Sequence, residues 1–372
     1  MSTTTRSSSV SHSAVTHSVV SRAEVFAADL GTRYPILLGP MAGACPVGLS
    51  IAVGNGGGMG ACGALLMEPA DIHQWADEFR SATNSQFQIN LWIPDKSPVR
   101  NDKHESSLAE FLNHWGPNVD VTHANESPPD FTAQCEALLD IAPPVISSIM
   151  GLFDTDYINR MKALNIRWYA NVSTVEEAMQ AEAAGADAIV AKGFEAGGHS
   201  GAFEPDNALR CGVGTLSLVP AIADSVSIPI IASGGIADGR TAAAALLLGA
   251  SAVQIGTGFL RAAESTIASA WSDAIGDARP EGTILTRAFS GRAGRSIATD
   301  YALAMESADA PEPAPYPVQR GLTKAMRTAA AKENNLAGMQ AWAGQSAALA
   351  QTCSATEITE NIWEATREIL SG

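Results

Sequence analysis

The sequence Gly185-Ala186-Asp187-Ala188-Ile189-Val190 is echoed later in the chain as Gly249-Ala250-Ser251-Ala252-Val253-Gln254. In each copy a glycine follows a helix-like segment and precedes an apolar run. Before the first copy, residues 173–176 have the spacing of a capping box, and Gly185 is typical of the position just past a helix end. Residues 241–248 form the corresponding segment before the second copy. The pattern indicates one helix–strand unit that occurs twice.

Similar apolar runs alternate with helix-like segments along most of the chain. We expect strands at 36–39, 87–91, 145–149, 166–172, 187–190, 228–232 and 251–255, and helices at 46–53, 68–80, 155–164, 175–184, 216–225 and 241–248. A spacing of roughly 25–35 residues implies parallel strands joined by helical crossovers. The glycine-rich segment 55–60 is expected to be a loop or a very short strand. We therefore predict an α/β fold, a TIM (β/α)8 barrel, with an open doubly wound sheet as the alternative.

The two ends of the chain differ from this pattern. Residues 1–21 are rich in Ser and Thr and lack acids, which favours a disordered tail over a transit peptide, because the latter would carry more arginine. Residues 22–372 are then the barrel. After the last strand we expect helices at 264–275, 323–332, 339–350 and 357–370, a loop-rich segment at 282–301 and an extended connector at 311–317. This C-terminal part is predicted to lie over the barrel mouth, with 282–352 forming a small substrate or lid region.

Composition excludes several classes of function. The formal charge of −16 argues against a nucleic-acid surface, so any phosphate must be held by backbone N–H groups. Five scattered cysteines indicate reduced thiols in a cytoplasmic protein, and no apolar run is long enough for a membrane span. The polar segment 94–129, with one helix expected at 106–115, carries His104, His114 and His123. Their spacing matches no compact metal site, so we predict none.

The chemistry is expected on the loop that follows the strand of the first copy. Residues 191–201 read Ala-Lys-Gly-Phe-Glu-Ala-Gly-Gly-His-Ser-Gly. A barrel places its site at the carboxyl ends of its strands, and the glycines let a ligand approach the backbone. His199 can exchange a proton near neutral pH. Glu195 is the rival catalytic candidate, but a role in fixing the loop by accepting hydrogen bonds is favoured.

Two later loops predict a phosphate site. Residues 230–239 run from a strand into Gly234-Gly235 and then a helix, and the next strand leads into Gln254-Ile255-Gly256-Thr257-Gly258. Each loop alone is equally compatible with a tight turn. Together they resemble the device in which two consecutive late strands of a barrel hold one phosphate on loop N–H groups and a helix end. Neither a Rossmann fingerprint nor a Walker A motif is present. The cofactor that fits is FMN.

These residues also carry a family resemblance. The chain resembles the nitronate monooxygenases, once called 2-nitropropane dioxygenases, which are FMN-dependent TIM barrels. The matching blocks are Pro40-Met41-Ala42-Gly43, Asn90-Leu91-Trp92-Ile93-Pro94, 193–201, 233–257 and, in the tail, Pro315-Tyr316-Pro317 and Trp342-Ala343-Gly344-Gln345. Together they span about residues 35–349.

The resemblance implies the roles of particular residues. His199 matches the active-site histidine, and the positions that contact FMN are Met41, Asn90, Gly197, Gly234, Gly235, Gln254, Gly256 and Thr257. One position departs from the family, which usually has Gln where this chain has Lys192. A lysine there would place positive charge by the N1/O2 edge of the flavin, or it would point away. Trp342 and Gln345 are either pocket residues or helix-packing residues.

The resemblance implies oxidation of alkyl nitronates, and of nitroalkanes if His199 acts as a base. Dioxygen would be consumed through a flavin semiquinone, giving a carbonyl compound and nitrite or nitrate. The alternative is an FMN-dependent enoyl-acyl carrier protein reductase that uses NADH, which shares the Glu-Ala-Gly-Gly-His block but is disfavoured by the tail block. A third hypothesis is a non-catalytic flavin-binding protein. The expected partners are a small-molecule substrate and O2, in a monomer or homodimer, with no nucleic acid and no membrane.

Overall fold

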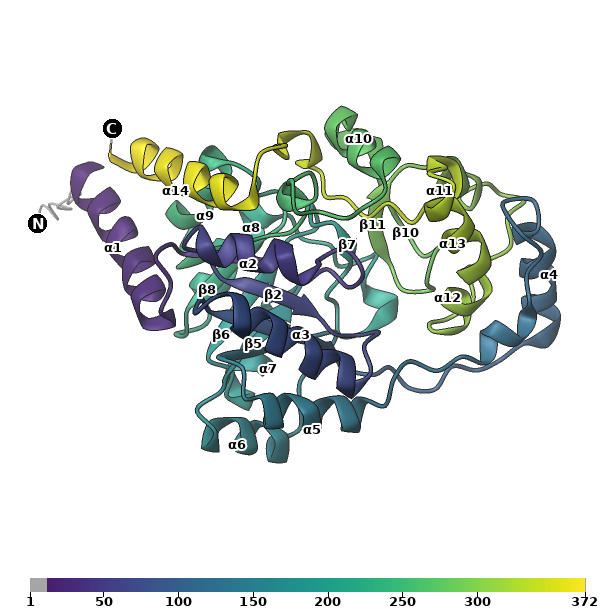
Figure 1. Cartoon of the computed structure of the whole chain (residues 1–372), viewed down its shortest axis with the longest axis horizontal. Helices are drawn as coiled ribbons and strands as arrows, with labels where there is room; N and C mark the ends of the chain where they lie inside the picture. The colour runs from purple at the N-terminus through teal and green to yellow at the C-terminus, as the bar shows by residue number, and fades with distance from the viewer. Residues whose placement is uncertain (1–11, 372) are drawn as a thin grey trace, which may run out of the picture.

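The computed structural model describes residues 12–371, and its centre is a closed barrel of parallel strands (Figure 1). Eight strands form one sheet in the order β1-β9-β8-β6-β5-β4-β3-β2. The sheet closes because the backbone of Met59, just before β2, exchanges hydrogen bonds with Ile36 and Leu38 of β1. The predicted barrel is therefore confirmed, and the open sheet is excluded. The strands are β1 Ile36–Leu38, β2 Gly60–Gly63, β3 Phe87–Trp92, β4 Val145–Ile149, β5 Arg167–Val172, β6 Ala188–Lys192, β8 Ile230–Ser233 and β9 Ala252–Ile255.

A ring of helices covers the outside of the barrel. Its members are α2 Val47–Asn55, α3 Pro69–Ala82, α5 Phe131–Ile141, α6 Thr155–Ala163, α7 Val175–Ala184, α8 Thr215–Ala223, α9 Gly239–Leu247 and α14 Ala355–Ser371. Helix α7 begins with a capping box between Thr174 and Glu177, one residue later than the sequence suggested, and ends at Gly185 with φ 98°. That left-handed backbone favours glycine, as predicted.

Alternate residues of the strands face two different cores. Outward-facing residues such as Ile189, Ile230 and Val253 join the large core beneath the helices. Inward-facing residues such as Val190 and Ile231 form a separate core inside the barrel. This period of two follows from strand geometry, and both faces are apolar because both are covered.

Helix α1, His12–Leu30, closes the amino-terminal end of the barrel. Phe26 and Leu30 pack onto the inner core, and Arg22 donates to the carbonyls of Leu246 and Ala250. The predicted disordered tail is thus wrong for residues 12–21, which belong to this helix, while residues 1–11 lie outside the described part. The reason is tertiary, since α1 gains its stability from the open end of the barrel that it covers.

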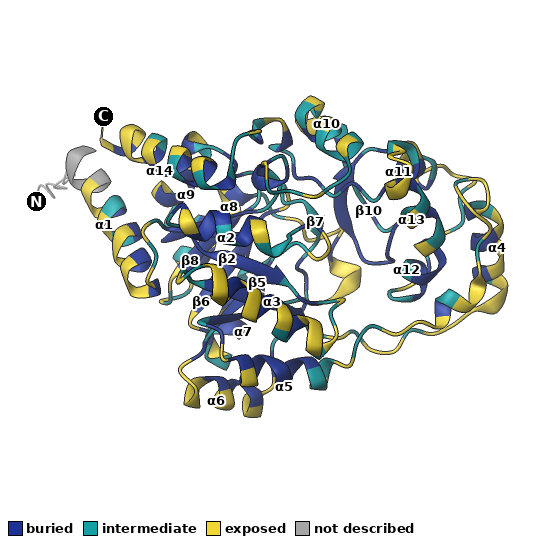
Figure 2. Ribbon diagram, in the orientation of Figure 1, coloured by how far each residue is buried: buried dark blue, intermediate teal, exposed yellow. Residues whose placement is uncertain are grey.

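Two insertions at the opposite end form a cap over the mouth (Figures 1 and 2). The first follows β3 and contains α4 Asp102–Leu112 and the short helix Val121–Asn125. The second follows β9 and contains α10 Ser269–Asp277, β10 Thr283–Thr286, β11 Gly294–Ile297, α11 Asp300–Ala304, α12 Val318–Leu322 and α13 Lys324–Lys332. Leu108 and Leu112 of the first pack against Phe289, Tyr301 and others of the second, so the cap has a core of its own.

The chain after β9 differs from its prediction in three ways. Residues 282–301 contain the antiparallel pair β10–β11 rather than loop alone, and β11 also pairs with β7, Gly198–His199. Residues 339–350 are not a helix but an extended segment with short turns, because Ser296 and Arg295 bind its backbone. The last helix, α14, packs on α9 and α2 and completes the ring instead of covering the mouth.

Two elements of the barrel were missed. Strand β2 reads Gly-Ala-Cys-Gly and has no propensity of its own. It must begin with glycine, because a Cβ at Gly60 would lie 2.8 Å from the Phe79 ring and 2.9 Å from the Ser50 carbonyl oxygen. Helix α5 follows the polar insertion directly, and Asp130 caps its start. None of the described helices is long and apolar enough to cross a membrane.

Replacing Phe26 by alanine tests the role of α1. The side chain is 8% exposed and packs against the inner core, so we expect Phe26→Ala to lower the free energy of unfolding by about 3 kcal/mol in chemical denaturation. The neighbouring Val25 is 65% exposed, and Val25→Ala should change the value by less than about 0.5 kcal/mol. Equal effects of the two substitutions would show that α1 does not seal the barrel.

Candidate functional site

A cavity of about 360 Å³ lies between the carboxyl ends of the strands and the cap. On the barrel side its lining includes Asn90, Asn171, Lys192, Ser233 and Gln254, which lie within two residues of the carboxyl ends of β3, β5, β6, β8 and β9. On the cap side it is lined by Arg320, Arg327, Gln340 and Trp342. The volume is that of a small-molecule or cofactor site.

The floor of the cavity consists of polar side chains held in place by hydrogen bonds. Gln88 Nε2 donates to Gln254 Oε1 at 3.0 Å, and Asn90 Nδ2 donates to Ser147 Oγ at 3.0 Å. Asn171 Nδ2 donates to the Ser148 carbonyl at 2.9 Å. Buried polar groups normally need such partners, and the network fixes which amide face points upward. The floor therefore presents a set of preorganised polar groups to any ligand above it.

Two glycine loops form an N–H cradle at one side of the floor. Gly234 and Gly235 have φ of 101° and 73°, and their conformation turns the backbone toward the cavity. Within residues 12–371, the N–H groups of Gly234, Gly235 and Ile236 donate to no backbone or side-chain acceptor. Successive N–H groups of this kind bind anions. The cradle fits a phosphate group.

The cradle differs from the prediction in one respect. The sequence pattern suggested that the amino end of the following helix would also hold the anion. In the structure Asp238 caps the amino end of this helix, α9. Its carboxylate accepts a hydrogen bond from the Thr241 N–H at 2.9 Å. The Asp238 carboxylate thus places negative charge at the start of this helix, which disfavours a second anion there and leaves the N–H groups of the loop as the better fit for one. Gly256 and Thr257, on the adjacent loop, complete the same wall of the cavity.

His199 stands on β7 between the floor and the cap. Its Nε2 lies 2.7 Å from Ser290 Oγ, and the indoles of Trp92 and Trp342 meet the imidazole edge-on at centroid distances of 4.6 and 4.8 Å. The Ser290 hydroxyl also lies 3.2 Å from the Arg292 carbonyl oxygen, and when it donates there, the Nε2–H of His199 donates to Ser290. In that tautomer Nδ1 keeps a free lone pair.

The environment of His199 keeps the imidazole neutral. Burial lowers the pKa of His199 well below its ordinary value, and the nearby charges of Arg320, Arg292, Lys192 and Arg327 lower it further. Both causes penalise the imidazolium form. At neutral pH His199 is therefore a hydrogen-bonding group and a weak base.

Two arginines of the cap make the outer wall of the cavity positive. Arg327 binds only neutral groups, with its guanidinium donating to Thr323 Oγ1, Gln340 Oε1 and the Arg320 carbonyl, and burial lowers its pKa to about 9. The Arg320 guanidinium makes no hydrogen bond or ion pair with any residue between 12 and 371. By contrast, Arg292 is paired with Asp95. The unpaired guanidiniums favour an anionic ligand.

Glu195 holds the loop in place through hydrogen bonds. Its carboxylate accepts from the Thr215 N–H at 2.9 Å and from Thr215 Oγ1 at 3.0 Å. The Glu195 carbonyl accepts from the Gln345 N–H at 2.9 Å. The structural role favoured for Glu195 from the sequence agrees with these contacts.

The structure brings the predicted site residues together around the one cavity. His199 and all the positions expected to contact the cofactor line it: Met41, Asn90, Lys192, Gly197, Gly234, Gly235, Gln254, Gly256 and Thr257. Trp342 lines it as well, whereas Gln345 does not. The three histidines of the polar insertion do not gather, since His104 Nε2 bonds the Glu312 carbonyl and His114 bonds its own helix. No metal-ligand cluster occurs among the described residues.

Sequence reasoning missed the cationic residues of the cap. Arg320 and Arg327 lie in a segment without any chemical motif, more than a hundred residues after His199. Ser290, the partner of His199, likewise lies in a segment expected to be only a loop. A weak signal existed in the spacing of the two arginines, seven residues apart, which places them on one side of a helical segment.

Comparisons with known proteins agree on one family. A family model described as nitronate monooxygenase matches residues 24–365. A probable nitronate monooxygenase of Staphylococcus aureus strain Newman is 36% identical over 353 residues, covering 92% of this chain and 96% of the relative.

Solved structures with the same fold include a nitroalkane oxidase and FabK. The nitroalkane oxidase from Streptomyces ansochromogenes has a TM-score of 0.83 and 32% identity, covering 91% of this chain and 97% of that one. FabK from Thermotoga maritima has a TM-score of 0.72 and 29% identity, covering 93% and 96%.

The depressed pKa of His199 predicts how stability depends on pH. The unfolded chain takes up a proton on this histidine as pH falls through about 6.5, whereas the folded chain does not, so stability should decrease below that pH and be unaffected above it. The contribution is at most about 1.4 kcal/mol per pH unit. Unfolding of the wild type and of His199→Gln should be compared at pH 7.5 and 5.5.

We expect the wild type to lose more stability between these two pH values than His199→Gln. Replacement of His114, an exposed histidine bonded to its own helix, is the matched control and should leave the wild-type pH slope unchanged. A wild-type slope identical to that of His199→Gln would contradict a neutral His199.

Proposed function

Because the chain belongs to the nitronate monooxygenase family, we propose that this oxidoreductase binds FMN and uses O2 to convert alkyl nitronates into carbonyl compounds and nitrite or nitrate. The observation that carries the proposal is a neutral His199 in a cavity whose outer wall bears unpaired arginines. Such a cavity suits an organic anion that is already deprotonated.

The residues of the cavity fit FMN. The free N–H groups of Gly234, Gly235 and Ile236, with Gly256 and Thr257 beside them, would hold the phosphate. The polar floor of Asn90, Lys192 and Gln254, with Met41 and Gly197 at its edges, would contact the ring and its side chain. When bound, FMN supplies the redox chemistry, accepting electrons from the nitronate and returning them to O2.

The protein's own groups then orient the substrate. The nitronate oxygens would face Arg320 and Arg327, and the edges of Trp92 and Trp342 would confine the carbon chain beside His199. Buried among cations and hydrogen-bonded to Ser290 through Nε2, His199 offers only a weakly basic nitrogen to the ligand. Abstracting a proton from a neutral nitroalkane is therefore unfavourable, and nitronates should be the better substrates.

The resemblance of the chain to FabK keeps the NADH-dependent enoyl reductase as a second candidate. The two functions differ in their electron source. A nitronate is itself the electron donor, whereas reduction of an enoyl thioester needs a reduced nicotinamide. Assays of each substrate with and without NADH therefore distinguish the two functions.

The decisive experiment is oxygen consumption by the purified, FMN-loaded protein. We expect rapid uptake with ethyl or propyl nitronate in the absence of NADH, and turnover of neutral nitroethane slower by a factor of about 100 or more, since no efficient base is available. NADH oxidation driven by an enoyl thioester, with no nitronate-dependent uptake, would assign the reductase function instead. A protein that takes up no FMN would refute both.

The arginines of the cap should determine the affinity for the anion. We expect Arg320→Gln to raise KM for a nitronate about tenfold with little change in kcat, because a charge-assisted hydrogen bond to the ligand is lost. Arg320→Lys should recover part of this effect. The matched control is Arg210→Gln, which removes an exposed arginine outside the cavity. A fall in kcat with KM unchanged would contradict a role in substrate binding.

A further inference from the structure

Lys192 is a cation on the floor of the cavity. It is the last residue of β6, in register with Ser233 of β8, which is in turn in register with Gln254 of β9. Residues in register on parallel strands point to the same side, so the lysine side chain projects with Ser233 and Gln254 into the barrel mouth. The strand reaches two residues further than the sequence predicted, which makes Lys192 a fixed strand residue and not a mobile loop residue.

The ammonium group of Lys192 has no anionic partner among the described residues. Its Nζ donates to the Gly197 carbonyl at 3.2 Å, and no carboxylate of residues 12–371 lies within ion-pair distance. Burial lowers its pKa to about 8, so it remains mostly protonated at neutral pH. The ammonium group has three N–H donors and a full positive charge, but its one hydrogen-bond acceptor is a neutral carbonyl oxygen. A partly buried charge in this condition is costly unless a ligand supplies negative charge.

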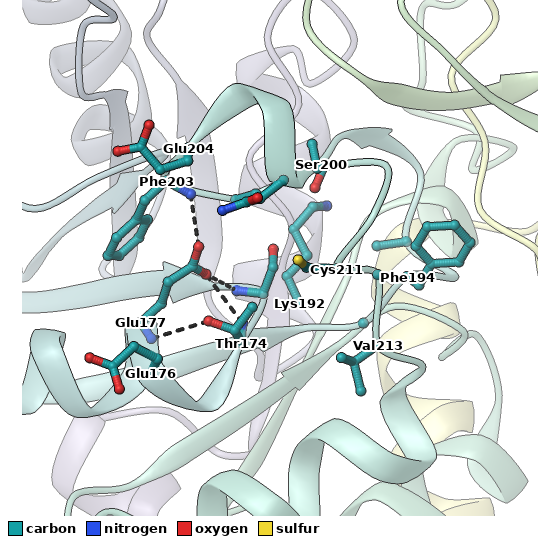
Figure 3. A pocket seen from close by; sticks show the side chains of 18 of the residues that line it. Thr174, Glu176, Glu177, Lys192, Phe194, Ser200, Phe203, Glu204, Cys211 and Val213 are labelled. Atoms are coloured by element: carbon teal, nitrogen blue, oxygen red, sulfur yellow. Dashed lines mark hydrogen bonds between the residues drawn. The ribbon is translucent and has the colours of Figure 1, made fainter.

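An anionic ligand for Lys192 is not expected in the second cavity that this residue lines. A second cavity, of about 330 Å³, is lined by Lys192 and by residues on both sides of His199 in its loop (Figure 3). Lys192 lines the first cavity as well. Its wall contains Glu176, Glu177 and Glu204. Glu177 is engaged by the N–H groups of Ser173 and Phe203, and Glu176 and Glu204 stand across the cavity from Lys192 in Figure 3. An anion would be repelled from this wall.

The substrate is not the natural partner either. Under the proposed function its anionic group would be bound by Arg320 and Arg327, which line the cap side of the cavity. A planar ring whose phosphate occupies the Gly234–Gly235 cradle would be held against the barrel side of the cavity, where Lys192 is the one cation among the lining residues. The positive charge of Lys192 therefore acts on the ring of the cofactor.

We propose that Lys192 is a positioning residue that stabilises the negative charge which the flavin ring acquires on reduction. This inference rests on the proposed FMN site. Reduction of the ring, or addition of a nucleophile at N5, places negative charge on the N1–C2=O part of the ring. An ammonium group beside the ring favours both events, because it attracts the added negative charge. The residue thereby raises the tendency of the ring to accept electrons from the substrate.

Sulfite and the reduction potential test the proposal without enzymatic turnover. Sulfite attacks N5 of the oxidised ring, its sulfur lone pair forms the S–N5 bond, and the displaced electron pair moves to the N1–C2=O end. Lys192→Gln keeps a hydrogen-bonding side chain and removes the charge. We expect it to raise the dissociation constant for sulfite at least about tenfold and to lower the two-electron potential by about 30 mV, the equivalent of a tenfold change.

The potential is the critical readout, because sulfite is itself an anion and is attracted by any nearby lysine. Lys192→Arg should retain most of both properties, since it keeps the charge. Lys162→Gln, which removes a lysine exposed on α6, is the matched control and should change neither. FMN affinity, measured by flavin fluorescence, confirms that each variant carries its cofactor.

Two results would overturn the proposal. One is a Lys192→Gln variant that binds FMN with wild-type sulfite affinity and potential. The other is a variant with an unchanged potential and a raised KM for the nitronate, which would make Lys192 a substrate-binding residue. A wild-type protein that binds no FMN would instead refute the proposed function, so the two failures are distinguishable.

Discussion

The parallel closure of the barrel is the constraint on which the site depends. Since all eight strands run in one direction, their carboxyl ends open on a single face, and side chains at these ends converge there. Closure through Met59 and Ile36 leaves no free sheet edge. Toward the amino-terminal end the inward-facing residues are apolar and form a packed core under α1. Toward the carboxyl end the inward-facing residues are polar. The barrel interior is therefore a packed apolar core at one end and the polar floor of the cavity at the other.

The cavity is lined by positive charges although the chain as a whole is strongly negative. The chain carries a net charge of −16, yet the cavity has Lys192 on its floor and Arg320 and Arg327 on its outer wall, none of which forms an ion pair among the described residues. Such an arrangement costs stability, because buried cations lower one another's pKa and that of His199. Repulsion between like charges is usual at a binding site whose ligand supplies the opposite charge.

The two insertions convert the open mouth into an enclosed cavity. Pairing of β11 with β7 fixes His199 against Gly294, and Trp342 from the extended tail segment packs on the imidazole. The cap therefore positions the same histidine that the barrel loop presents. It does so through its own small core, in which Leu108 of one insertion meets Phe289 of the other.

Local sequence was sufficient for the parts of the molecule whose chemistry is local. The repeated helix–strand unit, Gly185 at a helix end and the glycine loops around Gly235 and Gly256 were predicted, and they lie where the barrel needs them. These features depend on propensity, capping and period, which act over a few residues. The boundaries of the predicted barrel elements differ from the observed ones by at most two residues, as at the end of β6 at Lys192, whereas α4 and α10 of the cap begin four and five residues from their predicted starts.

Only the tertiary structure could place what depends on distant partners. The helicity of residues 12–21, the extended course of 339–350 and the position of α14 in the ring are set by surfaces that the rest of the chain provides. The same holds for Arg320, which no motif marks, and which reaches the cavity because the cap folds back over the barrel. The sequence by itself determined the barrel, the loop of His199 and the N–H cradle. The tertiary structure decided which charges face them, because long-range packing has no local signature.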